Sequence, residues 1–196
     1  METVRRLGLV VVMMVVALVV GSGVALAAVK YGTDGSDEFF GTNEEDVFYG
    51  RGGSDFLEGC GGDDVLYGGD DADLVGDGLC RRSGDDKLYG GDGDDEMFSF
   101  PGDDILHGGT GNDSLFEGEG NNTMFGGSGN DFFQATAIDP DRPGSEDTTP
   151  KKKDLVFCGS GSRDTVVVDP GRVDFVASDC ERVYVRTGQG DTLVRR

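Results

Sequence analysis

The chain reads Gly90-Gly91-Asp92-Gly93-Asp94-Asp95-Glu96-Met97-Phe98, and the pattern returns eighteen residues later in Gly108-Gly109-Thr110-Gly111-Asn112-Asp113-Ser114-Leu115-Phe116. Eleven such nonapeptides, each resembling Gly-Gly-x-Gly-x-Asp-x-apolar-x, lie between residues 32 and 134. They form two blocks in strict register, which a four-residue insertion at 77–80 separates. A short repeat of fixed period predicts a solenoid, in which each repeat buries its apolar side against its neighbours.

Three columns of the repeat make separate physical demands. The sixth position is acidic in ten copies and an amide in one: Asp37, Asp46, Asp55, Asp64, Asp73, Asp86, Asp95, Asp104, Asp113, Asn122 and Asp131. The eighth position is apolar throughout: Phe39, Phe48, Leu57, Leu66, Val75, Leu88, Met97, Leu106, Leu115, Met124 and Phe133. The fourth position is glycine in nine copies: Gly35, Gly53, Gly62, Gly84, Gly93, Gly102, Gly111, Gly120 and Gly129. Glycine permits tight turns, the apolar residue gives each short strand one inward side chain, and Asp offers the oxygen ligands that calcium prefers.

The acidic column predicts that the solenoid needs a cation. Carboxylates stacked at the strand spacing of about 4.8 Å repel each other by about 3.5 kcal/mol at an effective dielectric constant near 20. One apolar side chain per nine residues offers little burial in return. A divalent ion between consecutive turns would convert this repulsion into attraction, so we expect calcium binding and folding to be one coupled equilibrium.

Two alternatives stay open at this point. The first is a disordered acidic linker, which the composition alone would favour. The strict phase of the apolar residue over eleven copies argues against it, because linkers have no reason to keep such a period. The second alternative is a β-solenoid that binds no metal.

These motifs resemble the RTX, or hemolysin-type, calcium-binding repeats of secreted bacterial proteins. The resemblance implies an all-β fold, a parallel β-roll with two nonapeptides per turn, and several calcium ions shared between adjacent turns. The implied ligands are the eleven sixth-position side chains and the carbonyl groups of the turns that contain the nine fourth-position glycines. Stacking would place Asp37 near Asp55 on one edge and Asp46 near Asp64 on the other. The sequence departs from the family pattern at Glu44, Asp71, Asn122 and Arg81-Arg82.

Four cysteines in an exported chain indicate two disulfides, for which three pairings are possible, with free thiols as the alternative. In the implied β-roll, the turn that contains Cys60 and the turn that contains Cys80 stack on the same edge. We therefore expect a Cys60–Cys80 bridge, which leaves Cys158–Cys180 as the second.

Residues 1–27 read as a secretory signal peptide. A basic pair, Arg5-Arg6, precedes an apolar stretch from Leu7 to Val20, and Ala25-Leu26-Ala27 fits a cleavage site. We expect this segment to be a helix that is removed after Ala27, so that the protein is secreted or held at the cell surface. The alternative is a membrane anchor, for which the apolar stretch is short against the usual span of about 20 residues.

The net charge of −21 is concentrated in the repeats. Residues 28–134 carry 26 acidic and five basic side chains, whereas residues 135–196 carry 11 and ten. So negative a surface repels nucleic acid and anionic lipid. We therefore expect calcium ions as partners, no nucleic acid, and no membrane once the signal is removed.

The nonapeptide pattern stops after residue 134. Residues 135–153 contain Pro140, Pro143 and Pro150 and three lysines, which predicts a loop or linker. Runs rich in β-branched residues then follow Asp154 and Asp164, which favours further strands. We interpret residues 154–196 as a degenerate continuation of the solenoid or its cap. A small separate β-domain is the alternative.

Other chemistry finds little support in the sequence. The sole histidine, His107, has no second histidine to pair with in a zinc or catalytic motif, and we expect an exposed residue at a strand end. Aromatic residues at ninth positions predict one packed, half-buried column rather than a carbohydrate platform: Phe40, Tyr49, Tyr67, Tyr89, Phe98, Phe116 and Phe125. We expect a non-enzymatic, extracellular calcium-binding protein. The alternatives are a calcium-stiffened structural or adhesive protein and a secreted hydrolase or toxin component.

Overall fold

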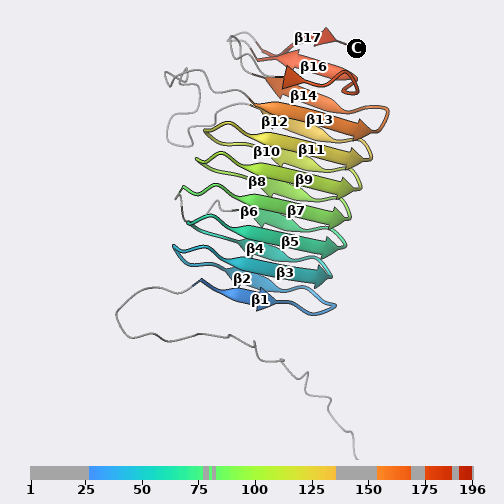
Figure 1. Cartoon of the computed structure of the whole chain (residues 1–196). Coiled ribbons are helices and arrows are strands. Elements are labelled where there is room, and N and C mark those ends of the chain that lie inside the picture. The colour runs from blue at the N-terminus through green and yellow to red at the C-terminus, as the bar shows by residue number, and fades with distance from the viewer. Residues whose placement is uncertain are drawn as a thin grey trace, which may run out of the picture.

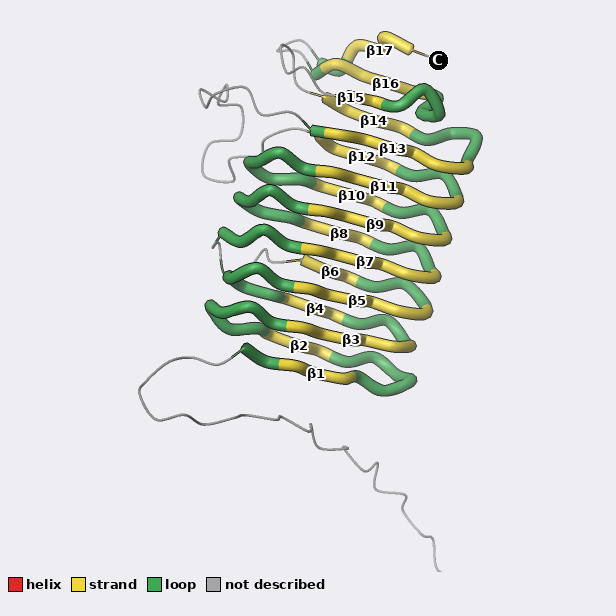
Figure 2. Tube along the Cα trace, viewed as in Figure 1, coloured by secondary structure: helices red, strands yellow, loops and turns green. Residues whose placement is uncertain are grey.

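A computed structural model shows the chain wound into a long stack of flattened coils (Figure 1). It describes residues 27–76, 80, 83–135, 154–168, 175–186 and 190–195. The predicted signal-peptide helix lies outside these residues except for Ala27, and so does most of the predicted linker at 135–153. In the described part of the chain every regular element is a strand, and Figure 2 shows these strands joined by turns.

The strands belong to two sheets. The odd-numbered strands up to β15 form the first sheet, in the order β1 (Val29–Tyr31), β3 (Val47–Gly52), β5 (Val65–Asp70), β7 (Lys87–Asp92), β9 (Ile105–Thr110), β11 (Thr123–Ser128), β13 (Leu155–Ser160) and β15 (Phe175–Val176). The second sheet runs in the order β2 (Glu38–Phe40), β4 (Phe56–Glu58), β6 (Leu74–Gly76), β8 (Glu96–Phe98), β10 (Ser114–Phe116), β12 (Phe132–Ala135), β14 (Thr165–Val168), β16 (Arg182–Val185) and β17 (Thr192–Arg195).

Each strand pairs in parallel with the strand one full turn away. Phe48 of β3 stands opposite Leu66 of β5, eighteen residues later, so two nonapeptides make one turn. The insertion at 77–80 leaves this register intact, because Leu66 still stands opposite Leu88 of β7. The prediction of an all-β parallel β-roll is therefore confirmed.

The core is a single file of apolar side chains between the two sheets. All eleven eighth-position residues are buried, from Phe39 at 4% exposure to Leu106 and Phe133 at 0%. Val156 and Val166 continue the file beyond the repeats. The second-sheet strands of the repeats are three or four residues long, and the six-residue strands of the first sheet carry glycine at their second buried position, so each strand buries one large apolar side chain.

The turns lie on two edges of the roll. The turns that follow the odd-numbered strands lie on one edge, which we call the regular edge. From residues 32–37 to residues 126–131 these turns contain no insertion. The turns after the even-numbered strands form the interrupted edge. Both long insertions fall there, since one lies between β6 and β7 and the other between β12 and β13.

The strands after the linker share the same two sheets. Thr123 of β11 pairs in parallel with Leu155 of β13, and Phe132 of β12 pairs with Thr165 of β14. The last strand, β17, runs antiparallel to β16 and lies at the end of the second sheet. At the opposite end, Lys30 stands in the core file opposite Phe48, with its ammonium group 4.7 Å from the centre of that ring.

The ninth-position aromatic residues are divided between the two sheets rather than forming the predicted single column. The first sheet carries a stacked ladder whose ring centres lie 4.4–5.2 Å apart: Tyr31, Tyr49, Tyr67, Tyr89, His107, Phe125 and Phe157. Phe40, Phe98 and Phe116 lie instead on the second sheet. His107 is half-buried between Tyr89 and Phe125, so the expectation of an exposed strand-end residue was wrong. Consecutive repeats alternate between the two sheets, which is why one sequence position is divided between them.

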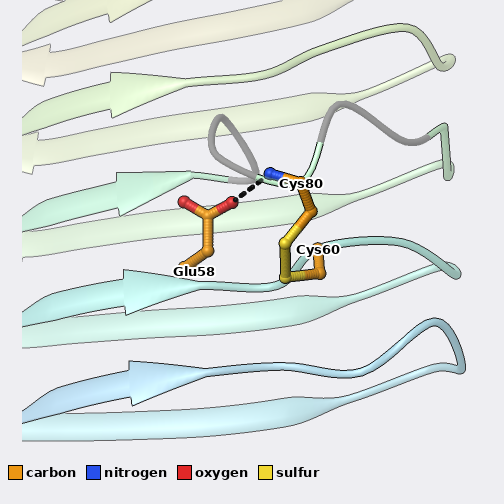
Figure 3. Close-up of side chains that lie close together, drawn as sticks. All are labelled: Glu58, Cys60 and Cys80. Atoms are coloured by element: carbon orange, nitrogen blue, oxygen red, sulfur yellow. Dashed lines mark hydrogen bonds between the residues drawn. A yellow bond between two sulfur atoms is a disulfide. The ribbon is translucent and has the colours of Figure 1, made fainter.

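Both predicted disulfides are present. Cys60 and Cys80 have their Cα atoms 4.9 Å apart, and Cys158 and Cys180 have theirs 5.1 Å apart. The first bridge ties the insertion on the interrupted edge to the turn below it (Figure 3). Beside it, the buried Glu58 accepts a hydrogen bond from the N–H of Cys80 at 3.3 Å.

Candidate metal centre

The sixth-position aspartates of the regular edge form a continuous ladder along the roll. The backbone N–H of each donates to Oδ1 of the equivalent residue one turn later. The donor–acceptor distances lie between 2.8 and 3.0 Å, and the ladder runs through Asp37, Asp55, Asp73, Asp95, Asp113, Asp131 and Asp164. Asp164 in turn donates to Glu181 at 2.8 Å. One oxygen of each carboxylate is thus held in place by the neighbouring turn.

The interrupted edge carries a second ladder of the same construction. Its donor–acceptor distances lie between 2.7 and 3.0 Å, and it runs through Asp46, Asp64, Asp86, Asp104, Asn122 and Asp154. The two insertions do not break it, since Asp64 reaches Asp86 across 22 residues and Asn122 reaches Asp154 across 32. The structure therefore brings the predicted ligand column together as two separate rows.

The other carboxylate oxygen, Oδ2, has a different environment. In eight of these residues it is buried and has no hydrogen-bond partner in the described part of the protein: Asp55, Asp64, Asp73, Asp95, Asp104, Asp113, Asp131 and Asp164. A buried oxygen of this kind costs free energy unless a partner satisfies it. Such a row of acceptors that point inward and lack donors suits a cation.

Backbone oxygens surround these carboxylate oxygens. A Cβ atom placed on Gly90 would lie 2.2 Å from Asp95 Oδ2 and 2.6 Å from the carbonyl oxygen of Gly108 on the next turn. The same atom on Gly108 would lie 2.3 Å from Asp113 Oδ2 and 2.7 Å from the carbonyl oxygen of Gly126. The first glycine of the repeat thus leaves room for an oxygen-lined cradle, and oxygen-only donor sets suit calcium.

The fourth-position glycines pack backbone against backbone. A Cβ atom on Gly111 would lie 1.8 Å from the carbonyl oxygen of Gly93, and one on Gly102 would lie 1.8 Å from that of Gly84. Glycine is therefore required sterically at these turns. Gly35, at the open end, meets nothing closer than 3.9 Å.

Burial raises the pKa of the eight ladder carboxyls whose Oδ2 atom has no hydrogen-bond partner among the described residues. The pKa rises to about 7 in Asp64, Asp73, Asp104 and Asp113. It rises to about 6 in Asp95 and Asp131. Desolvation is the main cause; the backbone hydrogen bond from the preceding turn opposes it, and acidic neighbours, mainly on the adjacent turns, add to it. Without a cation, the charged form of these groups is disfavoured near neutral pH.

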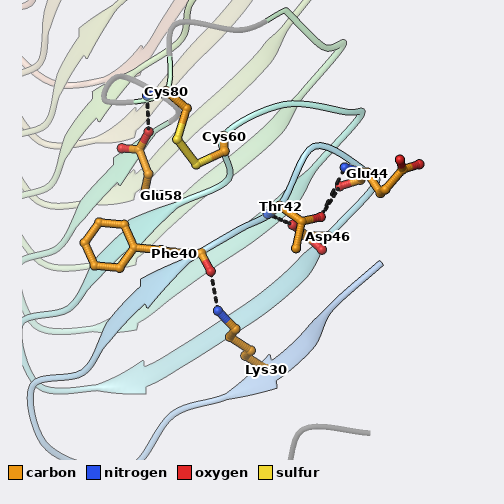
Figure 4. The surroundings of a disulfide bond; sticks show 8 residues. All are labelled: Lys30, Phe40, Thr42, Glu44, Asp46, Glu58, Cys60 and Cys80. Atoms are coloured by element: carbon orange, nitrogen blue, oxygen red, sulfur yellow. Dashed lines mark hydrogen bonds between the residues drawn. A yellow bond between two sulfur atoms is a disulfide. The ribbon is translucent and has the colours of Figure 1, made fainter. Parts of the chain in front are cut away.

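The first two predicted ligands differ from the rest. Asp37 Oδ2 accepts the N–H of Thr33 at 2.6 Å, and Asp46 Oδ2 accepts the N–H of Thr42 at 2.6 Å. Figure 4 shows Asp46 with Thr42 and Glu44 around it. In both turns a backbone N–H of the same turn thus satisfies the Oδ2 atom, so the cradle is less complete at this end of the roll.

Sequence reasoning missed a second set of ladders at the fifth position. On the interrupted edge, the N–H of Asp103 donates to Asp85 Oδ1 at 2.9 Å, and that of Asp85 donates to Asp63 Oδ1 at 3.0 Å. On the regular edge, Asn112 donates to Asp94 Oδ1 at 2.7 Å. These bonds run in the opposite direction to those of the sixth position. The run of Asp or Asn at every fifth position from 85 to 130 was the signal.

Sequence reasoning also left out three acids that continue the sixth-position ladders beyond the repeats, namely Asp154, Asp164 and Glu181. Asp154 and Asp164 each precede a strand, as every sixth-position residue does, and this placement could have identified them.

The interrupted edge also has an acidic surface hollow of about 250 Å³ beside Asp63, Asp85 and Asp103.

The comparisons with known proteins agree with this geometry. The RTX calcium-binding nonapeptide repeat matches the chain in four copies, at residues 31–59, 54–75, 82–99 and 98–133. The chain belongs to the RTX calcium-binding repeat family. No curated protein and no solved structure matched it. RTX repeats bind calcium, and the two rows of inward-facing carboxylates are the part of this RTX β-roll that fits the ion.

Among the residues that the structure describes, no helix is long and apolar enough to cross a membrane.

Proposed function

We propose that this RTX protein is exported, has no enzymatic activity, and folds outside the cell when its two ladders bind several calcium ions. The observation that carries the proposal is the series of eight buried Oδ2 atoms without a hydrogen-bond partner among the described residues. Calcium ions bound there would supply the positive charge that two rows of stacked carboxylates need.

The ligands follow from the same geometry. We assign calcium binding to the sixth-position carboxylates of both edges, with Asp154 and Asp164 as continuations, and to carbonyl oxygens of the glycine turns, including those of the fourth-position glycines. The cradle beside Gly90 and Gly108 combines a carboxylate oxygen with a carbonyl oxygen of the next turn, so each ion would join two turns. This joining of neighbours is the physical reason to expect cooperative binding.

Coupling to folding follows from the small core. Each rung buries one apolar side chain per sheet, while it also buries an acidic group whose charged form desolvation disfavours. Sites of extracellular calcium-binding modules typically have dissociation constants of about 10⁻⁴–10⁻³ M. Sites of this strength would be empty in a calcium-poor cytoplasm and filled outside the cell. A signal peptide at residues 1–27 would direct the chain out of the cell and would then be removed.

A calcium titration of residues 28–196 tests the proposal. Far-ultraviolet circular dichroism should show a cooperative gain of β-structure as calcium is added, and calorimetry should show several ions bound per chain. Magnesium, which demands a tighter octahedral shell, should produce little of this change at the same concentration. A chain that keeps full β-structure in excess EDTA would rule out coupled folding.

A further inference from the structure

Among the repeat turns of the interrupted edge, the turn at residues 117–122 alone departs from the repeat at both its first and its sixth residue. Its first residue is Glu117 where the repeat has glycine, and its sixth is Asn122 where the repeat has Asp. The two side chains are in contact, since Asn122 Nδ2 donates to Glu117 Oε2 at 3.0 Å. Both are buried, with 0% and 1% of their surface exposed.

Asn122 keeps one function of the aspartate that it replaces. Its Oδ1 accepts the N–H of Asp104 at 2.9 Å, so the backbone ladder continues unbroken. The amide nitrogen Nδ2 then takes the place of the second carboxylate oxygen. An amide NH₂ group is a donor without acceptor capacity, so Asn122 cannot offer a cation the oxygen that Asp55 or Asp64 offers.

Glu117 brings a carboxylate back to the same turn. Where a turn of this edge begins with glycine, that glycine lies beside the inward carboxylate oxygen, as a Cβ atom on Gly59 would be 2.3 Å from Asp64 Oδ2. The side chain of Glu117 starts from this position and reaches Asn122 inside the turn. The hydrogen bond from Asn122 uses one lone pair of Oε2, whereas a carboxylate has about four acceptor sites, so coordination of a cation is compatible with that bond.

We propose that Glu117 supplies the calcium-binding carboxylate of the 117–122 turn in place of the sixth-position Asp. The carboxylate has moved from the sixth to the first position, and the turn keeps its negative charge and its inward oxygen. This inference rests on the proposed calcium-dependent function. It assigns a ligand to the one repeat that lacks the acidic sixth residue.

The test compares variants of the mature chain by calorimetric calcium titration. In Glu117→Gln the amide oxygen still accepts the hydrogen bond from Asn122, but the charged ligand is lost. We expect one fewer ion bound, or one site weakened about tenfold or more, in line with the loss of a residue that supports a metal site. The matched control is Glu119→Gln, which removes the same charge two residues away at a half-buried third position and should titrate like the wild type.

A double variant separates ligation from packing. Glu117→Gly combined with Asn122→Asp restores the ordinary repeat, and it should recover the wild-type stoichiometry that Glu117→Gly alone loses. The double variant also decides the matter if Glu117→Gln fails to fold in saturating calcium, because it should then fold and bind fully. Wild-type binding in Glu117→Gln, or no recovery in the double variant, overturns the assignment of Glu117 as a ligand but leaves the proposed function intact. A wild-type chain that binds no calcium overturns the proposed function as well.

Discussion

The backbone N–H of Asp95 donates to Oδ1 of Asp113, 2.9 Å away and one full turn later in the roll. Each ladder carboxylate therefore has two functions that belong to different atoms. Oδ1 fixes the spacing of adjacent turns, whereas Oδ2 is directed into the oxygen-lined cradle. Substitutions that separate these two functions give the sharpest tests of the site.

The double substitution Asp95→Asn with Asp113→Asn should preserve the backbone ladder, because the amide oxygen accepts the same bond, as it does in Asn122. It should nevertheless weaken calcium binding on the regular edge and lower its cooperativity. Asp95→Ala with Asp113→Ala should weaken binding further, since the N–H groups of Asp73 and Asp95 then lose their acceptors. Calorimetric titration of both variants checks this order, and unchanged binding in either would remove these residues from the ligand set.

The pKa values predict an unusual dependence of stability on pH when calcium is absent. The pKa of Asp73 and of Asp113 is raised to about 7 in the folded state, against about 3.9 in an unfolded chain. The folded state then binds more protons than the unfolded state between these values, so its stability falls as the pH rises from about 4 to about 7. In EDTA, β-structure measured by circular dichroism should therefore be greater at pH 4.5 than at pH 7.5.

Saturating calcium should remove this loss of stability. Calcium ions and protons compete for the same folded-state carboxylates, whereas the carboxylates of the unfolded chain are ionised throughout pH 5–8. The calcium-bound folded state and the unfolded state therefore bind equally few protons in this range, so the free energy of unfolding in saturating calcium should change little between pH 5 and 8. Unfolding curves at constant ionic strength measure it, and a loss with rising pH as steep as that in EDTA would show that the ions do not bind at the carboxylates with raised pKa.

The period of nine determined much of what could be predicted. It located the apolar file from Phe39 to Phe133 and the sixth-position column, because a strict register allows only one inward side chain per strand. It also led to the Cys60–Cys80 bridge, since stacked turns bring those residues together. These features depend on the phase of the repeat and on little else.

Features that depend on the alternation of sheets or on departures from the repeat were harder to predict. His107 reads as isolated in the sequence, yet it stacks between Tyr89 and Phe125 because those residues lie one turn away on the same sheet. The pairing of Glu117 with Asn122 is invisible to a column-by-column comparison, because it joins two different positions of one turn. The opposite directions of the fifth- and sixth-position ladders depend on side-chain orientation, which the pattern does not specify.

Two glycines of the regular edge should respond very differently to alanine. Gly91 has φ +125°, and a Cβ atom there would lie 2.1 Å from the carbonyl oxygen of Gly69. Gly91→Ala should lower the free energy of unfolding in calcium by about 2 kcal/mol or more, because the left-handed backbone and the close contact both oppose a side chain. At Gly52 the nearest atoms would be 3.8 Å away, so Gly52→Ala should change it by no more than about 0.5 kcal/mol. Thermal unfolding in saturating calcium compares them, and equal losses would contradict the close stacking of turns.

The Cys158–Cys180 bridge should stabilise the C-terminal end of the roll independently of calcium. It joins β13 to the segment before β16 across 22 residues, in a part of the chain where the full glycine repeat has ended. A loop of this length restricts the unfolded chain by about 3 kcal/mol. Cys158→Ser with Cys180→Ser should therefore lower the free energy of unfolding by about 2–4 kcal/mol at saturating calcium, while the number of ions bound to the repeats stays the same. Unfolding curves and calorimetry on the same preparation measure both quantities. If the number of bound ions fell together with the stability, the bridge would be holding part of the calcium site in place, and the ladder from Asp131 to Asp164, which spans the junction, would be the first segment to test.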